Sequence, residues 1–265
     1  MSLQNDPRST RELIQLALTE EDEDAVWSLQ YRANQEVLTA ASNLCNSQNP
    51  KERELGATIL GQLGIPQRNF PDESLTILLN LLKHEQNTDV LSSIGFALGH
   101  LRDGRAISSI INQKKKPNSS VRHGVVFALL GYEEELAINT LIELSTEEDD
   151  EVRNWATFGL GSQIETDTPA IREALYQRFL NENVENNYGI YGEALVGLAK
   201  RKDSRILTRL VEELSSDYVG ILAVEAAAEM ADSRLYPALI KLQQWWTGNS
   251  NLLETAINNC QEVNQ

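Results

Sequence analysis

The sequence is poor in cysteine, and it has no long apolar run. Its two cysteines, Cys45 and Cys260, lie far apart in the 265 residues. This spacing argues against the disulfide framework of a secreted protein and favours two thiols in a reducing cytosol. No apolar stretch approaches the roughly 18 residues that a membrane-spanning helix needs. The first residues also lack the basic start and apolar stretch of a secretory signal. We therefore expect a cytoplasmic protein that has no membrane partner.

Aromatic residues are scarce as well, at 6% of the chain, whereas alanine and leucine are abundant. This composition argues against a β-rich core and favours helices that pack through small and branched side chains. The alternation of apolar and polar residues that marks a strand is absent. The sequence therefore predicts an all-α protein.

Basic residues are outnumbered, and the formal net charge is −16. Acidic blocks at 20–24 and 147–151 hold part of this charge, and we interpret them as solvated loops and helix N-termini. Because an acidic protein is repelled by phosphate backbones, we expect no nucleic-acid partner. The charge favours a partner with a basic surface.

Residue patterns that would indicate catalysis or a cofactor are lacking. His84, His100 and His123 fall at different helix phases, and no cysteine lies near them, so we expect no metal site. No nucleophile elbow, phosphate-binding loop or dinucleotide fingerprint occurs. We therefore expect no cofactor and assign no catalytic residue. The sequence favours a non-catalytic protein but leaves the question of an enzyme open.

A helical phrase recurs along the chain, most plainly in residues 121–129 and 152–160, which begin 31 residues apart. A period of this length indicates a solenoid, because a single helical hairpin cannot bury its apolar side without neighbours. If the first apolar residue of the second helix is position zero, the copies align at position eight. The aligned residues are Leu60, Leu98, Leu129, Leu160, Leu198, Met230 and Cys260. Apolar or small residues at positions zero, four, seven and eight form one helical stripe.

The pattern predicts an α-α superhelix of about seven to eight hairpins. We expect residues 1–34 to form capping helices and residues 35–265 to form the solenoid, continuous with the cap as one domain. The expected helix pairs are 35–46 with 50–63, 72–84 with 87–101, 105–116 with 118–131, 134–145 with 149–163, 168–181 with 187–200, 203–215 with 217–231, and 234–247 with 250–262. Thr168 and Pro169 predict a helix start, with the threonine as N-cap.

These units resemble HEAT repeats of the short, phycobilisome-lyase-like bacterial type, through phrases such as residues 151–161, Glu-Val-Arg-Asn-Trp-Ala-Thr-Phe-Gly-Leu-Gly. The stretch from Val121 to about Trp246 is similar to uncharacterised bacterial HEAT-repeat proteins. Residues 152–156 and 201–203 are also similar to an enterobacterial HEAT protein proposed as an immunity factor against a polymorphic toxin. The resemblance implies a solenoid whose second helices line the concave surface.

The resemblance also implies a structural role for the arginine at position one of the second helix, present as Arg53, Arg122 and Arg153. Such arginines generally join a ladder of hydrogen bonds with acidic residues, for which Asp89 and Glu151 are the candidates here. Other residue types stand at this position in the remaining copies, so we expect a partial ladder.

Candidate partner-binding residues lie on the helix side away from the core stripe. Position six carries phenylalanine in three consecutive copies, and position two adds a histidine and an asparagine. Position three adds a tryptophan and two acids within small, apolar helices. The candidates are Phe96, His123, Phe127, Asn154, Trp155, Phe158, Glu193 and Glu225. The rings form either an aromatic strip that anchors a partner or packing contacts between repeats, and the sequence does not decide between the two. For Trp155 we favour a packing contact between repeats, and the role of the two acids, Glu193 and Glu225, stays open.

The leading functional hypothesis is a non-catalytic scaffold or adaptor, expected to be a monomer, that binds a protein or peptide on its concave face. An immunity-type inhibitor of a basic toxin is one version. A bilin lyase-like subunit that handles a tetrapyrrole is the alternative, although no residue pattern specific to tetrapyrrole attachment occurs. A HEAT-like DNA glycosylase is disfavoured by the charge, because Lys114, Lys115 and Lys116 lie at a helix end.

Overall fold

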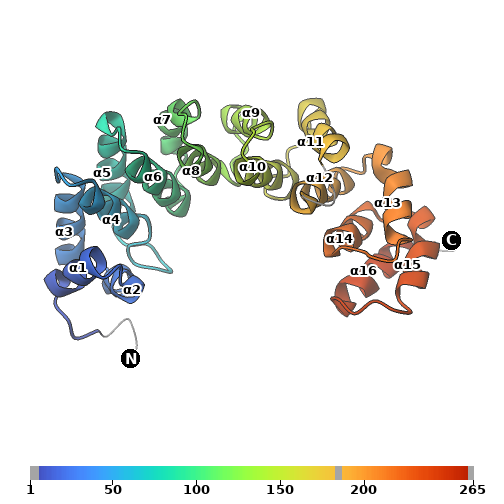
Figure 1. Ribbon diagram of the computed structural model, residues 1–265, viewed down its shortest axis with the longest axis horizontal. Helices are drawn as coiled ribbons and strands as arrows, with labels where there is room; N and C mark the ends of the chain where they lie inside the picture. Colours follow the sequence, from blue (N-terminus) through green and yellow to red (C-terminus); the bar gives the residue numbers. More distant parts are fainter. Residues whose placement is uncertain (1–5, 183–186, 262–265) are drawn as a thin grey trace. The chain divides into compact units, whose positions relative to one another are not determined.

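The computed structural model describes residues 6–182 and 187–261, and within these ranges the only regular structure is helical (Figure 1). The contacts divide the chain into two compact units, Met1–Leu130 and Gly131–Gln265. In the described residues, no helix combines the length and the apolarity needed to cross a membrane.

The first unit begins with a helix pair that packs on the repeats after it. The elements are α1 (Thr10–Thr19), α2 (Glu23–Arg32), α3 (Gln35–Cys45), α4 (Pro50–Gly61), α5 (Pro71–His84), α6 (Thr88–Leu101), η2 (Gly104–Ala106), α7 (Ile107–Ile110), η3 (Ile111–Gln113) and α8 (Ser119–Leu129). Helices α1 and α2 contact α3 and α4. That this pair caps the array stays a prediction.

Helices α4, α6 and α8 form the second-helix layer of the first unit, with α3, α5 and α7 beside them (Figure 1). Within this layer α6 packs most closely on α8, because glycines face each other at the crossing. A Cβ at Gly95 would lie 2.6 Å from the backbone of Gly124. Real Cβ atoms do not approach backbone atoms so closely, so the contact requires a residue without a side chain.

The second unit repeats this plan. Its elements are α9 (Glu135–Leu144), α10 (Asp150–Ser162), α11 (Pro169–Asn181), α12 (Tyr188–Lys200), η4 (Ser204–Ile206), α13 (Leu207–Leu214), α14 (Ile221–Met230), η5 (Ser233–Leu235), α15 (Tyr236–Leu242) and α16 (Ser250–Cys260). Helices α10, α12, α14 and α16 form its second-helix layer. Gly161 and Gly197 make the close crossing between α10 and α12, since a Cβ at Gly197 would lie 2.5 Å from Gly161 Cα.

Side-chain caps fix where most second helices begin. The N-cap side chains accept hydrogen bonds from the first backbone N–H groups of the helix, which otherwise have no partner within it. These caps are Asn49, Asn87, Asn118, Asp149 and Asn249. Thr168 caps α11 with Pro169 in the first turn, as the sequence predicts.

The predicted all-α repeat is confirmed: each of the seven expected pairs corresponds to a pair of helices, with shifts of a few residues. The helix expected at 105–116 is a short α7 flanked by two 3₁₀ turns, and it ends at Gln113. The helix expected at 234–247 ends at Leu242. Part of the loop at 182–187, at residues 183–186, lies outside the described residues. The core stripe is buried, and Cys45 and Cys260 are buried free thiols.

Candidate functional site

The second-helix surface of the first unit carries a cluster of four rings from α6 and α8. The centroids of Phe96 and Phe127 lie 5.0 Å apart. His123 meets Phe96 edge-on at 5.2 Å, and His100 meets Phe127 edge-on at 5.1 Å. These distances are typical of favourable aromatic pairs. The structure thus brings together three predicted residues and adds His100, which the sequence analysis considered only as a metal ligand.

Each of the four rings is half-buried. Position six points away from the core stripe, and Gly99 leaves room for the neighbouring ring, because a Cβ there would lie 2.5 Å from Phe127 Cδ1. The phenylalanines therefore pack against each other and against the adjacent helix while part of each ring remains accessible. The rings thus make packing contacts between repeats, and their role as anchors for a partner stays a prediction.

A loop from the preceding repeat borders this cluster. Arg68, in the left-handed backbone region at φ 64°, donates through Nε to the carbonyl oxygen of His100 at 3.4 Å. Burial, and next the charge of Arg68, lower the pKa of His100 below its ordinary value. We therefore expect His100 to be a neutral ring at neutral pH, so that it adds an apolar and aromatic surface instead of a positive charge.

The second-helix surface of the second unit combines two aromatic rings with two acids. Trp155 meets Phe158 edge-on at a centroid distance of 5.6 Å, and both rings are half-buried, as is the predicted Asn154. Phe158 belongs to this unit and Phe96 and Phe127 belong to the other. A continuous strip through all three phenylalanines therefore stays a prediction.

The two predicted acids, Glu193 on α12 and Glu225 on α14, are both half-buried and act on each other electrostatically. Ser162 Oγ donates to Glu193 Oε2 at 3.1 Å. Burial, and then the charge of Glu225, raise the pKa of Glu193, although the bond from Ser162 opposes the shift. A carboxylate held in this way is stabilised by an incoming positive charge.

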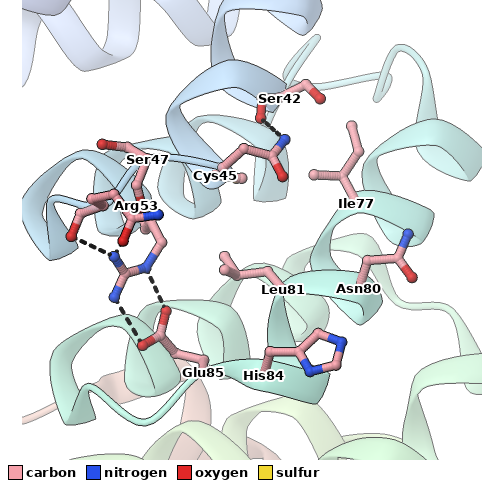
Figure 2. Close-up of a pocket in the computed structure, with 11 residues that line it drawn as sticks. Ser42, Cys45, Ser47, Arg53, Ile77, Asn80, Leu81, His84 and Glu85 are labelled. Carbon is pink, nitrogen blue, oxygen red and sulfur yellow. Dashed lines mark hydrogen bonds and ion pairs between the residues drawn. The ribbon is translucent and has the colours of Figure 1, made fainter.

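Two of the three predicted ladder arginines, Arg53 and Arg153, each bind a carboxylate about 30 residues further along the chain. Arg53 donates through Nη1 to the carbonyls of Ser47 and Gln48 at 3.0 and 3.1 Å, and through Nε and Nη2 to the carboxylate of Glu85 at 2.7 and 3.0 Å (Figure 2). The sequence analysis named Asp89 as a ladder acid without assigning it to one arginine, and the carboxylate that Arg53 binds is that of Glu85. Glu85 directly follows α5, so it reaches the loop before α4, whereas Asp89 lies in the first turn of α6.

Arg153 repeats this geometry in the second unit. Its Nη1 donates to the carbonyls of Glu147 and Glu148 at 2.6 and 3.1 Å, and its Nε donates to Glu182 at 2.7 Å. Its second carboxylate partner is Asp150 at 2.5 Å. Glu151 as a ladder acid stays a prediction.

Arg122 makes the same backbone contacts, at 2.8 Å each, to the carbonyls of Lys116 and Pro117. All three arginines therefore donate hydrogen bonds to two carbonyls of the loop that precedes their helix.

Two structural features were missed by the sequence analysis. The first is an Asp-x-Arg pair in which one Asp oxygen accepts from both the backbone N–H and Nε of the arginine, with backbone distances of 2.9 to 3.1 Å. It recurs at 6/8, 103/105, 203/205 and 232/234, so its repetition was a usable signal. The second is Arg201, which is 7% exposed. It donates to the carbonyls of Leu160, Gly161, Ile164, Thr166 and Gly197.

A cavity of about 580 Å³ lies between α3 and α5 in the first unit, beside the Arg53–Glu85 pair (Figure 2). Cys45 contributes to its lining, but burial raises the pKa of this thiol to about 12. A thiol with such a pKa is a poor nucleophile at neutral pH. Among residues 6–182 and 187–261, no group of three or more His, Cys, Asp or Glu side chains is arranged to hold a metal ion.

Comparison with known proteins now identifies the repeat. The family described as HEAT repeats matches residues 75–161. Protein YibA of Escherichia coli, from strains K12 and O157:H7, is 30% identical over 248 residues, which cover 80% of this chain and 75% of YibA. The chain belongs to the HEAT-repeat family.

Solved structures agree with this assignment. The X-ray structure of Escherichia coli YibA matches 96% of this HEAT-repeat chain and 92% of its own, with a TM-score of 0.76 and 25% identity. An archaeal HEAT-like repeats protein from Thermococcus onnurineus NA1 matches with a TM-score of 0.53 and 16% identity, over 96% of this chain and all of its own. The second likeness shows the fold alone.

Proposed function

We propose that this HEAT-repeat protein is a non-catalytic binding module that holds a protein or peptide partner on its second-helix surfaces. The observation that carries the proposal is the half-exposed ring cluster of Phe96, His100, His123 and Phe127. Aromatic residues that remain partly accessible on a rigid helix layer are typical anchors of protein interfaces, since they bury much apolar area at little entropic cost.

The charge of the protein supports a partner with a basic surface. A net charge of −16 steers basic molecules toward it and repels acidic ones. Glu193 and Glu225 add a local reason in the second unit, because a cation placed near them offsets the cost of burying Glu193. An immunity-type inhibitor that masks a basic toxin is one version of this function.

Affinity capture from the native cytosol, followed by a direct affinity measurement with the recovered partner, tests the proposal. The wild type is compared with a Phe96→Ala/Phe127→Ala variant. Because these are central apolar anchors, we expect the double substitution to raise Kd by at least about tenfold. Circular dichroism establishes that the variant keeps its helix content.

Leu136→Ala and Leu180→Ala are matched controls. Both leucines are exposed, at 51% and 54%, and both lie on first helices, α9 and α11. We expect them to leave Kd unchanged. Recovery of the same partners with the same affinity by the phenylalanine variant would make the ring cluster irrelevant to binding and would contradict the proposal.

A further inference from the structure

A groove in the first unit occupies the place where a third phenylalanine would stand. Thr58 on α4 holds the same repeat position as Phe96 on α6 and Phe127 on α8. Beside this shorter side chain, a cavity of about 400 Å³ opens between α4 and the α1–α2 pair. The cavity on α4 thus lies at the repeat position that carries the ring cluster on α6 and α8.

The groove has apolar walls and an acidic rim. Leu18, Val26 and Leu55 supply apolar surface from α1, α2 and α4. Three carboxylates line it, namely Glu21, Glu23 and Glu54, against one ammonium group, that of Lys51. Lys51 lies 4.0 Å from Glu21, and both of these side chains are largely exposed. The lining groups therefore leave a net negative charge around an apolar floor.

Glu54 connects the groove to the ring cluster. Ser93, which lies on α6 one turn before Phe96, acts on this carboxylate and lowers the pKa of Glu54. Burial, and then the charge of Asp89, raise the pKa of Glu54, so its ionised form lacks sufficient compensation in the free protein. A cation in the groove would supply that compensation.

We propose that this groove receives a lysine or arginine side chain of a partner segment that also contacts the ring cluster. The inference rests on the proposed function and deepens it by naming the chemistry of one partner residue. Lysine and arginine fit because their apolar stems cover apolar surface while the charged end reaches polar groups at the rim. Here the stem contacts Leu18 and Val26, and the charge lies near Glu54 and Glu23.

The spacing between neighbouring helices determines the length of a suitable test peptide. Neighbouring packed helices lie about 8–10 Å apart, and an extended chain covers that distance in about three residues. We therefore choose acetyl-Lys-Ala-Ala-Phe-amide, with two comparison peptides that carry norleucine or glutamate in place of lysine. Norleucine keeps the apolar stem and removes the charge. Binding is followed by NMR through the methyl signals of Leu18, Val26 and Leu55 in the full-length protein.

We expect the lysine peptide to shift these three methyl signals with saturation, and the norleucine and glutamate peptides to bind at least about tenfold more weakly. Glu54→Gln should weaken the lysine peptide by a similar factor. Glu254→Gln on α16, an exposed acid in the other unit, is the matched control and should not change binding. The thermal midpoints of both variants establish that they fold.

Several results would overturn the inference. Equal binding of the norleucine peptide would mean that the groove takes an apolar segment. Shifts of the same methyl signals with protein concentration, without peptide, would mean that a second copy covers it. No shift over the soluble range of the lysine peptide would mean that the groove does not recognise a cation. A partner that depends on Phe96 and Phe127 but not on Glu54 would leave the proposed function intact and refute this inference alone.

Discussion

The two units build their second-helix surfaces on one repeat plan but fill equivalent positions differently. Both bring neighbouring second helices together through glycines, at Gly95 with Gly124 and at Gly161 with Gly197. At position six, α6 and α8 of the first unit and α10 of the second present phenylalanine, whereas α12 and α14 present the buried Val196 and Ala228. The helix packing therefore depends on the shared small residues, while the surface chemistry is free to differ between repeats.

Individual helices differ in how their ends are satisfied, although a left-handed backbone cap occurs in both units, at Arg102 and at Ala231. Helix α6 ends with Arg102 in the left-handed region at φ 53°, where its own N–H bonds back to Leu98. Near the ends of α10 and α12, five carbonyls accept hydrogen bonds from the single buried side chain of Arg201. A backbone cap involves only its own helix, whereas one guanidinium ties two helices and a loop together.

The largest effect should therefore follow from Arg201→Ala. The substitution leaves five carbonyls without their donor, in a buried setting where each such loss is costly. We expect the free energy of unfolding to fall by about 3 kcal/mol or more. Thermal unfolding followed by tryptophan fluorescence reports it, because Trp155, Trp245 and Trp246 lie in this unit.

Arg102→Ala is the matched control, as the corresponding arginine at a helix end in the first unit. It should change stability by less than about 1 kcal/mol, since the cap bond there comes from the backbone. If the two variants were equally stable, the proposed difference in how the ends are held would be wrong.

A smaller loss is expected from Gly95→Ala in the first unit. The added Cβ would lie 2.6 Å from Gly124, and the opposing atoms are backbone that cannot move aside alone. Overpacking of this kind costs typically about 1–3 kcal/mol. Because Phe96 and Phe127 lie on the two helices that would separate, we also expect weaker partner binding.

Gly189→Ala serves as the control for Gly95→Ala. A Cβ at Gly189 meets its nearest atom, Asn154 Oδ1, at an ordinary 3.5 Å. We expect no loss of stability from this change. An undisturbed melting curve for Gly95→Ala would show that the close crossing does not constrain α6 and α8.

Next in size is the pH-dependent effect of Glu85→Gln on the ladder of the first unit. Burial raises the pKa of Glu85, but hydrogen bonds from Arg53 and the N–H groups of Asn87 and Gln86 outweigh it, so the net pKa is lowered. A lowered folded-state pKa contributes stability above the ordinary value of 4.5 and loses it as the pH falls through the folded pKa. We expect the variant to lose about 1–2 kcal/mol at pH 7 and less at low pH.

Stability measured by urea titration across pH tests this prediction, with Asp89→Asn as the control. Asp89 is one of the two acids predicted for the ladder, whereas the carboxylate bonds of Arg53 go to Glu85. A larger destabilisation by Asp89→Asn than by Glu85→Gln would contradict the dominant role of Glu85 in this ladder.

The repeat and its core stripe could be predicted because burial of apolar side chains imposes a periodic pattern that loop insertions only offset. The orientation of Phe96 and Phe127 followed from the same periodicity. The hydrogen-bond partners of side chains in neighbouring repeats could not be predicted from this periodicity. Glu85 lies 32 residues from Arg53, and the register between them depends on loop lengths that periodicity does not fix.

The contacts of Arg201 and the groove beside Thr58 leave no recognisable pattern of side chains in the sequence. The acceptors of Arg201 are backbone carbonyls, which every residue carries, so neither their number nor their convergence can be recognised in the sequence. The groove beside Thr58 depends on what packs opposite a short side chain, and α1 and α2 show no strong repeat pattern. By contrast, the Asp-x-Arg pair is local and repeated, and it was available to be found.

The smallest predicted effect concerns the acidic surface of the second unit. Burial and the charge of Glu225 raise the pKa of Glu193 in the folded protein, while the unfolded chain keeps the ordinary value of 4.5. Between these two values the folded protein binds a proton that the unfolded chain lacks, so wild-type stability rises as the pH falls. Glu193→Gln has no charge to bury and should be more stable than wild type at pH 7. Because solvent screens a half-buried group, we expect a gain below about 1 kcal/mol.

This gain should disappear below pH 4.5, where both forms are neutral at this position. Thermal midpoints of wild type and Glu193→Gln across pH measure it, with the exposed Glu254→Gln as a control that should follow the wild type. A lower midpoint for Glu193→Gln at pH 7 would mean that the bond from Ser162 outweighs the cost of burial. The acid would then be a structural element, and the surface of the second unit would lose its local reason to prefer a basic partner.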